Sequence, residues 1–338
     1  MFFKKLEIYI TLFLVFIILY FGKFLLLPLF FSIFIFIVLK SLSKKISKIK
    51  FHVVNISYSL AFLISSLISL SLIYFFGILL NENLSKVISN SDLYQNNMIF
   101  IFNKIKEFSQ NSLPFPTNMF SFDLDFTIIF TKILNSFTNF AGNFSIIILY
   151  LIFIIIEENF FNIKINKLFS SNSTKKIIDK INLEIFNYFQ IKTFTSLLTG
   201  VSTFAVMNFF NSDLAIFFGI LSFILNFIPF LGSLLSILLP FIFSLIQFLN
   251  PFDSSLIIIF LLVVQISVGN FLEPRLMGKS LNLSPMIMLI FLSLMGQLWG
   301  IGGMFLSVPF LVILLIIFSN FTSTKKIALF LSEKGEIN

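Results

Sequence analysis

The densest group of polar residues in this strongly apolar sequence lies between Gln265 and Pro285. Gln265, Gly269 and Glu273 are spaced four residues apart, so they share one face of a predicted helix, and Asn270 stands beside that face. Amides and a carboxylate inside an apolar segment are typical of a transport path. We predict that these side chains bind a solute or gate its passage.

Two residues that follow Glu273 extend this candidate site. Pro274 is predicted to end the helix, because proline removes a backbone donor and clashes with the preceding turn. Arg275 is the one arginine among 23 basic residues. Because its planar guanidinium offers a fork that lysine cannot mimic, Arg275 indicates a geometric requirement. Gly278 comes next and is a candidate hinge.

A second polar group interrupts the apolar run 214–252, with Asn226, Pro229 and Gly232 in close succession. Pro229 removes a backbone hydrogen-bond donor, and Gly232 permits unusual backbone angles. Asn226 is then free to bond a released carbonyl group or a solute hydroxyl group. A tight turn between two membrane crossings and a transport site are both consistent with this pattern.

A third group is rich in glycine and surrounds Trp299, the only tryptophan. Its glycines let helices approach closely or bend, so we favour a hinge or packing role over solute contact. The residues assigned to this role are Gly296, Gly300, Gly302, Gly303 and Pro309.

The sequence offers little for catalysis. It has no cysteine and one histidine, His52, which argues against thiolate chemistry, histidine-rich metal sites and a Ser-His-Asp triad. It has no Gly-x-Ser-x-Gly motif and no phosphate-binding Walker loop. We therefore predict a protein that is not an enzyme and needs no cofactor or metal.

Composition places these groups in a membrane. Of the 338 residues, 58% are hydrophobic and 11% charged, which excludes an ordinary soluble enzyme. Crossing the bilayer takes about 20 apolar residues, and barrel strands would alternate polar and apolar residues. We expect an all-α polytopic protein of about eight transmembrane helices, with broken or re-entrant segments near 226–232 and 265–285. The runs without Asp, Glu, Lys or Arg are 8–22, 24–39, 51–81, 133–156, 193–212, 214–252, 254–272 and 280–324.

Lysine positions predict the orientation. Lysines precede the first span and follow the second, which places both ends of this pair in the cytoplasm. The stretch 157–192 and the tail are also lysine-rich, so both termini are predicted to be cytoplasmic. This orientation accounts for the net charge of +8 without a nucleic-acid partner.

The expected organisation has six parts. Residues 1–80 form a membrane hairpin, a basic loop and the third span; a single overlong first helix is the alternative to the hairpin. Residues 81–132 form a segment outside the cytoplasm, which lies on the outer surface or packs on a neighbouring subunit. The remaining parts are a fourth span at 133–157, a cytoplasmic amphipathic helix at 158–192, a transport core at 193–320 and a cytoplasmic tail at 321–338.

The three groups follow one another as NFIPFLGSLLSILLP, GNFLEPRLMGKSLNLSP and GQLWGIGGMFLSVP. In this order they resemble the autoinducer-2 exporter (AI-2E, or PerM-type permease) family. The resemblance implies a permease of the cytoplasmic membrane with about eight helices, which forms homo-oligomers. Members are associated with autoinducer-2 export or with sodium–proton antiport, so the resemblance leaves the cargo open.

Three functions follow from these observations. The first is export of a small polar solute, for which an autoinducer-2-like molecule is one candidate. The second is sodium–proton antiport, which needs a carboxylate deep in the membrane. Asp213, Asp253 and Glu273 all stand at the ends of apolar runs, which counts against antiport unless Glu273 dips inward with a broken helix. The third is a membrane scaffold that transports nothing.

Overall fold

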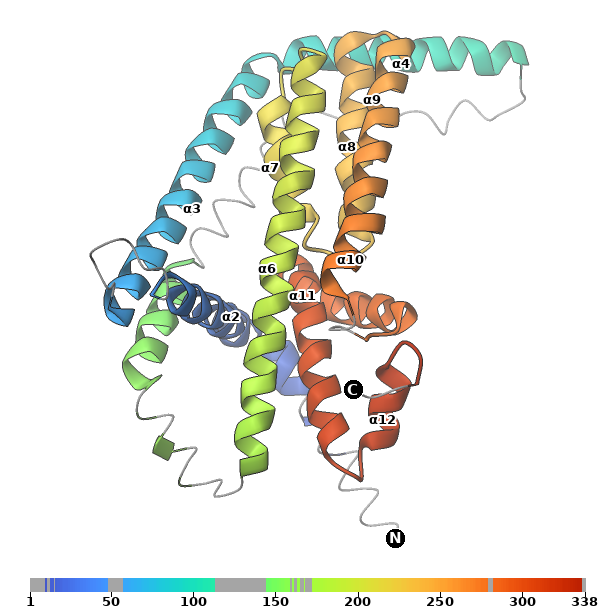
Figure 1. Cartoon of the computed structure of the whole chain (residues 1–338). Helices are drawn as coiled ribbons and strands as arrows, with labels where there is room; N and C mark the ends of the chain where they lie inside the picture. Colours follow the sequence, from blue (N-terminus) through green and yellow to red (C-terminus); the bar gives the residue numbers. More distant parts are fainter. Residues whose placement is uncertain are drawn as a thin grey trace. The chain divides into compact units, whose positions relative to one another are not determined.

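The computed structural model describes residues 16–47, 57–112, 144–158, 172–278 and 282–335, with a few single residues at 10, 13, 14, 160, 163, 164 and 167. These residues are helical apart from turns and one isolated antiparallel bridge between Leu283 and Ser332 (Figure 1). The predicted all-α class of polytopic membrane protein is confirmed. Segment 113–143, which holds the last part of the predicted outer segment and the start of the predicted fourth span, lies outside the described residues.

Four described helical stretches are long and apolar enough to cross a membrane. Two are the single helices α2 (Lys23–Ile46) and α8 (Leu231–Phe248). The third, Pro251–Met277, runs through α9 (Pro251–Gln265), a π-helical segment and α10 (Glu273–Met277). The fourth is α11 (Pro285–Asn320). The total of eight spans remains a prediction.

The chain divides into two compact units that do not follow the predicted parts. Unit 1 comprises residues 1–68, 141–191 and 277–338, and unit 2 comprises 69–140 and 192–276. The predicted transport core at 193–320 therefore contributes 193–276 to unit 2 and 277–320 to unit 1. Segments far apart in the sequence build each unit.

Unit 1 is held by aromatic packing between α2 and α11. Phe30 lies 4.7 Å from Phe310 and 5.6 Å from Trp299, measured between ring centroids. The Trp299 indole donates a hydrogen bond to the Leu19 carbonyl oxygen at 2.9 Å. The short helix α12 (Lys325–Leu331) packs on α11 and buries Ala328.

The start of α2 bears on the predicted N-terminal hairpin. Gly22 N–H donates to the Ile18 carbonyl, and Leu26 N–H donates to the Gly22 carbonyl. Helical hydrogen bonds therefore continue on both sides of Gly22, whose φ of −79° and ψ of 1° do not reverse the chain. This geometry favours the alternative, one helical stretch with a local break, because Lys23 by itself does not end a helix.

Helix α6 (Asn172–Phe209) continues across the predicted boundary at 192/193. The expected amphipathic cytoplasmic helix and the following span are one continuous helix of 38 residues. No proline or glycine stands between Asn172 and Thr199, so nothing in the backbone breaks it. A lysine marks the edge of an apolar run but does not interrupt helical hydrogen bonding.

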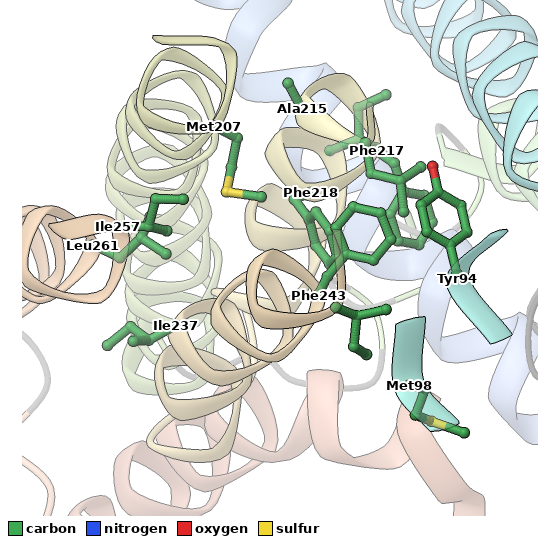
Figure 2. Packing of buried hydrophobic residues seen from close by; sticks show 13 residues of the cluster. Tyr94, Met98, Met207, Ala215, Phe217, Phe218, Ile237, Phe243, Ile257 and Leu261 are labelled. Atoms are coloured by element: carbon green, nitrogen blue, oxygen red, sulfur yellow. The ribbon is translucent and has the colours of Figure 1, made fainter. Parts of the chain in front are cut away.

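The core of unit 2 gathers side chains from five helices (Figure 2). Met207 of α6 and Phe217 and Phe218 of α7 (Ala215–Leu225) pack with residues of α8 and α9. Tyr94 and Met98 of α4 (Ser91–Ser112) complete the cluster. Figure 2 shows the Tyr94 ring beside this group, and its centroid lies 5.2 Å from that of Phe243.

Helix α4 is fastened to this core by polar contacts as well. The Tyr94 hydroxyl donates to Asp213 Oδ2 at 2.7 Å, and Asn97 Nδ2 donates to the Ile246 carbonyl at 3.0 Å. Burial and, after it, the neighbouring Asp213 raise the pKa of Tyr94, so the phenol stays a protonated donor. This part of the predicted outer segment therefore packs on unit 2 of its own chain, and its place on the outer surface stays a prediction.

A close approach of α6 and α7 in unit 2 gives a stability prediction. A Cβ atom at Gly200 would lie 2.7 Å from the Gly219 carbonyl oxygen and 2.9 Å from Phe223 Cβ. We expect Gly200→Ala to lower the unfolding free energy by about 1–3 kcal/mol, because the two helices must separate. Thermal unfolding of the purified protein, followed by circular dichroism, measures the change.

The matched control is Gly77→Ala on α3 (Tyr58–Ser89), also in unit 2, where a Cβ atom meets nothing within 4 Å. It should leave stability unchanged or raise it by up to about 1 kcal/mol, since alanine favours helix. Equal effects of the two substitutions would contradict the close packing.

Candidate functional site

One face of α6 carries a buried row of polar side chains. Lys192, Thr195, Ser196 and Thr199 all lie on this face, at spacings of three and four residues, and all are buried. The Thr199 hydroxyl donates to the Thr195 carbonyl at 3.0 Å. Such bonds within the helix allow threonine to be buried without a partner on another helix. The row therefore costs little to bury, except at the charged Lys192.

Lys192 is compensated by Glu273, the first residue of α10. Its ammonium Nζ lies 2.5 Å from Glu273 Oε1, with side-chain exposures of 6% and 16%. The Thr195 hydroxyl lies 3.3 Å from the second carboxylate oxygen, Oε2. A charge-assisted pair at this distance is strong, and both partners need it because water scarcely reaches them.

Asn226 joins the same region from the end of α7. Its Nδ2 donates to Ser196 Oγ at 3.1 Å, and the residue is 1% exposed. Its Oδ1 has no hydrogen-bond partner among the described residues. If the amide were turned around, the NH₂ group would be left over instead. In either orientation, half of a buried amide is available to a ligand.

The predicted interruption at 226–232 is a tight turn that brings α8 back against α7. Ile228 N–H donates to the Leu225 carbonyl at 2.8 Å, and Pro229 lies inside the turn. Phe230 has a left-handed φ of 59°. A Cβ atom at Gly232 would lie 1.7 Å from the Leu225 carbonyl oxygen, so only glycine fits here. The turn places Asn226 at the polar row.

The predicted interruption at 265–285 begins as a π-helical segment, Ile266–Leu272, between α9 and α10. The Glu273 N–H donates to the Val268 carbonyl, five residues back. Pro274 does not end a helix as predicted; it is the second residue of α10. Because proline lacks an N–H and crowds the preceding turn, a wider turn before it relieves the clash.

The π-helical segment also changes which predicted residues share a face. Gln265 is buried, and its Nε2 would lie 2.7 Å from a Cβ atom at Gly269, so these two remain adjacent. Glu273 turns toward Lys192. Asn270 and Arg275 are exposed, so the structure does not bring them to the cluster. We name Lys192, Thr195, Ser196, Asn226 and Glu273 the polar cluster; all five belong to unit 2.

The third group lies in unit 1 and takes part in packing and bending. Gly300, with φ of 64° and ψ of −147°, breaks the helical path inside α11. Beyond this kink, a Cβ atom at Gly303 would lie 2.1 Å from the Met295 carbonyl oxygen. Gly302 faces Leu27 of α2.

Three other members of the predicted hinge set have simpler surroundings. A Cβ atom at Gly296 would meet the flexible Met304 side chain, whereas Pro309 is buried inside α11. Gly278 has a left-handed φ of 55° just after α10, with open space around it.

Sequence reasoning missed three residues of the polar cluster, all on α6. Lys192 ends the lysine-rich stretch 157–192 and borders the apolar run 193–212, so the charge pattern gives no sign of a buried partner. Thr195, Thr199 and Thr203 recur every four residues inside that run, and this spacing was the available signal. In the described residues, no group of three His, Cys, Asp or Glu residues is arranged to hold a metal ion.

Fold and site together define a multi-pass, all-α membrane protein with interrupted helices and a buried polar cluster. The chain belongs to the AI-2E transporter family, whose model matches residues 8–323.

Three relatives illustrate this membership. A protein of Borreliella burgdorferi, named as a candidate transport protein, is 33% identical over 60% of this chain and 57% of its own length. Another so named, from Haemophilus influenzae, is 29% identical over 60% of each chain. The AI-2 transport protein TqsA of Escherichia coli is 27% identical over 61% of this chain and 60% of its own. The matched region thus spans about three fifths of these relatives.

The ion pair gives a second stability prediction. Lys192→Met leaves the Glu273 carboxylate buried without its cation, and we expect a loss of about 3–5 kcal/mol in unfolding free energy. The double variant Lys192→Met/Glu273→Gln removes both charges and should recover most of that loss. Thermal unfolding in one detergent compares the three proteins.

The control is the exposed pair Lys164–Glu157, with nitrogen and oxygen 3.2 Å apart and side-chain exposures of 57% and 61%. Lys164→Met should change stability by no more than about 1 kcal/mol, because water screens this pair. If Lys192→Met is as mild as Lys164→Met, the buried pair does not hold unit 2 together.

Proposed function

We propose that this protein is a membrane permease that exports a small polar solute, and that the solute binds at the polar cluster. The observation that carries the proposal is Asn226, a buried amide with half of its hydrogen-bonding capacity unused. Leaving such a group unsatisfied costs about 1–3 kcal/mol, which a bound solute would offset. Two interrupted helices and α6 meet at this point.

Family membership supports transport as the activity, and the name of the relative TqsA suggests an autoinducer-2-like cargo. The hydroxyl and amide groups of the polar cluster suit a small hydroxylated solute, because they can exchange hydrogen bonds with its hydroxyl groups. Gln265 and Gly269 are in contact with each other, and they precede Glu273 of the polar cluster in the sequence. We propose a supporting role for both in the same path.

We also propose that the protein lies in the cytoplasmic membrane with both termini inside. The support is the distribution of lysines at Lys40, Lys44 and Lys45 after the second apolar run and at Lys325 and Lys326 in the tail. A homo-oligomer agrees with the many large apolar side chains that each chain exposes to lipid or to another copy.

Sodium–proton antiport is the second candidate, and Glu273 is the observation that favours it. The sequence leaves antiport open if Glu273 dips inward with a broken helix, and the 16% exposure of its side chain beside a buried ammonium supports that condition. In this alternative the carboxylate exchanges a proton for a cation. Sodium-driven proton flux in proteoliposomes that is lost in Glu273→Gln would favour antiport over solute export.

Export is tested by comparing metabolites inside and outside cells that express the protein or its variants. Asn226→Leu keeps the side-chain size and removes the amide, so efflux of the exported solute should fall roughly tenfold, the loss of about 1.4 kcal/mol of binding. The amount of protein in the membrane fraction is measured alongside.

The matched control is Asn270→Leu, because Asn270 is an exposed amide on the neighbouring π-helical segment. Its efflux should stay near that of the unaltered protein. Efflux lost in Asn270→Leu but kept in Asn226→Leu would move the site from the polar cluster to the stripe predicted from sequence. Unchanged metabolites with the protein present would favour a scaffold.

A further inference from the structure

The Lys192 ammonium is only partly satisfied by the protein. It carries three N–H donors. Among the described residues, Glu273 Oε1 is its one hydrogen-bond acceptor. Two donors on a buried cation are thus left for oxygen atoms of a ligand, on the same face of α6 as Ser196 and the unused half of Asn226.

The charges of the polar cluster sum to zero. Lys192 contributes one positive charge and Glu273 one negative charge, whereas Thr195, Ser196 and Asn226 are neutral. Arg275, two residues beyond Glu273, is exposed and lies outside the polar cluster. A solute that brings a net charge would leave one charge unpaired in a buried place, at a cost of several kcal/mol.

A solute without net charge avoids this cost. Its hydroxyl or carbonyl oxygens can accept from the two unused Lys192 donors, and a hydroxyl group can donate to Glu273 or to Asn226. The bonds to Lys192 and Glu273 are charge-assisted, so they hold a neutral solute more firmly than bonds between neutral groups.

We propose that Lys192 and Glu273 together determine the charge selectivity of the site: Lys192 binds oxygen acceptors of an electroneutral solute, and Glu273 is the built-in counter-charge. This inference rests on the proposed transport function and adds the class of solute. It also assigns a role to Lys192, which borders an apolar run and carries no recognisable motif.

Changing one charge should change which solutes pass. Glu273→Gln leaves an unpaired cation, so an anionic solute becomes the better partner. Lys192→Gln leaves an unpaired carboxylate, so a cationic solute is favoured. The exchange Lys192→Glu/Glu273→Lys restores electroneutrality and should restore the original preference.

The experiment measures uptake of three small labelled probes into proteoliposomes: the neutral erythritol, the anion lactate and the cation ethanolammonium. The membrane voltage is held at zero with potassium and valinomycin, so that charge alone does not drive entry. We expect the unaltered protein to take up erythritol fastest. Glu273→Gln should raise the ratio of lactate to erythritol roughly tenfold, which corresponds to about 1.4 kcal/mol. Lys192→Gln should raise the ratio of ethanolammonium uptake to erythritol uptake by a similar factor.

The outcomes separate this inference from the proposed function. Ratios that stay the same in both single variants, in protein that remains monodisperse on gel filtration, would overturn the charge selectivity and leave export intact. The charge selectivity would also be overturned, with export intact, if the unaltered protein exports metabolites from cells but takes up lactate or ethanolammonium faster than erythritol. Absence of both cellular efflux and probe uptake would overturn the proposed function, and this inference with it. Recovery in the exchanged double variant excludes a loss of folding as the cause.

Discussion

Two opposite charges buried in an apolar chain form the contact on which the polar cluster of unit 2 depends. Lys192 and Glu273 are 81 residues apart in sequence, yet each needs the other once water is excluded. The pair requires α6 to continue past residue 192 and α10 to turn its first residue toward α6. The π-helical segment before Pro274 supplies that turn. The continuous α6 and the widened turn before Pro274 thus both serve to bring the two charges together.

The polar cluster builds on this pair with ordinary helix chemistry. Threonines of α6 satisfy their own hydroxyls, and a glycine that no other residue can replace, Gly232, lets the chain fold back so that Asn226 reaches Ser196. Close contact at Gly200 keeps α6 and α7 together. The same rigid frame therefore holds a charge pair, a hydroxyl group and a half-used amide in one place. In a membrane protein of the AI-2E transporter family, such a place is suited to a passing solute.

The features predictable from sequence are local ones. Pro229, Gly232 and Pro274 mark the interrupted helices because proline and glycine act on their own backbone. Membrane insertion and helical class follow from apolar runs. The partner of Glu273 was not predictable, since residue spacing carries no information on contacts between distant helices. Asn270, predicted to stand beside the face that carries Glu273, is exposed, because the π-helical segment shifts the helical period before Glu273. Pro274, predicted to end the helix, follows a widened turn instead.

A solute that binds at the polar cluster arrives from water, so the proposed function requires this buried cluster to open to water during transport. The chain has no cysteine, so single cysteines report cleanly. The measurement is the rate at which small hydrophilic methanethiosulfonates modify Ser196→Cys in native membranes, compared with Ser307→Cys. Both serines are buried, but Ser307 lies between the apolar core residues Leu306 and Val308 of α11. The account predicts that Ser196→Cys reacts and Ser307→Cys does not. Equal protection of both from either side of the membrane would contradict it.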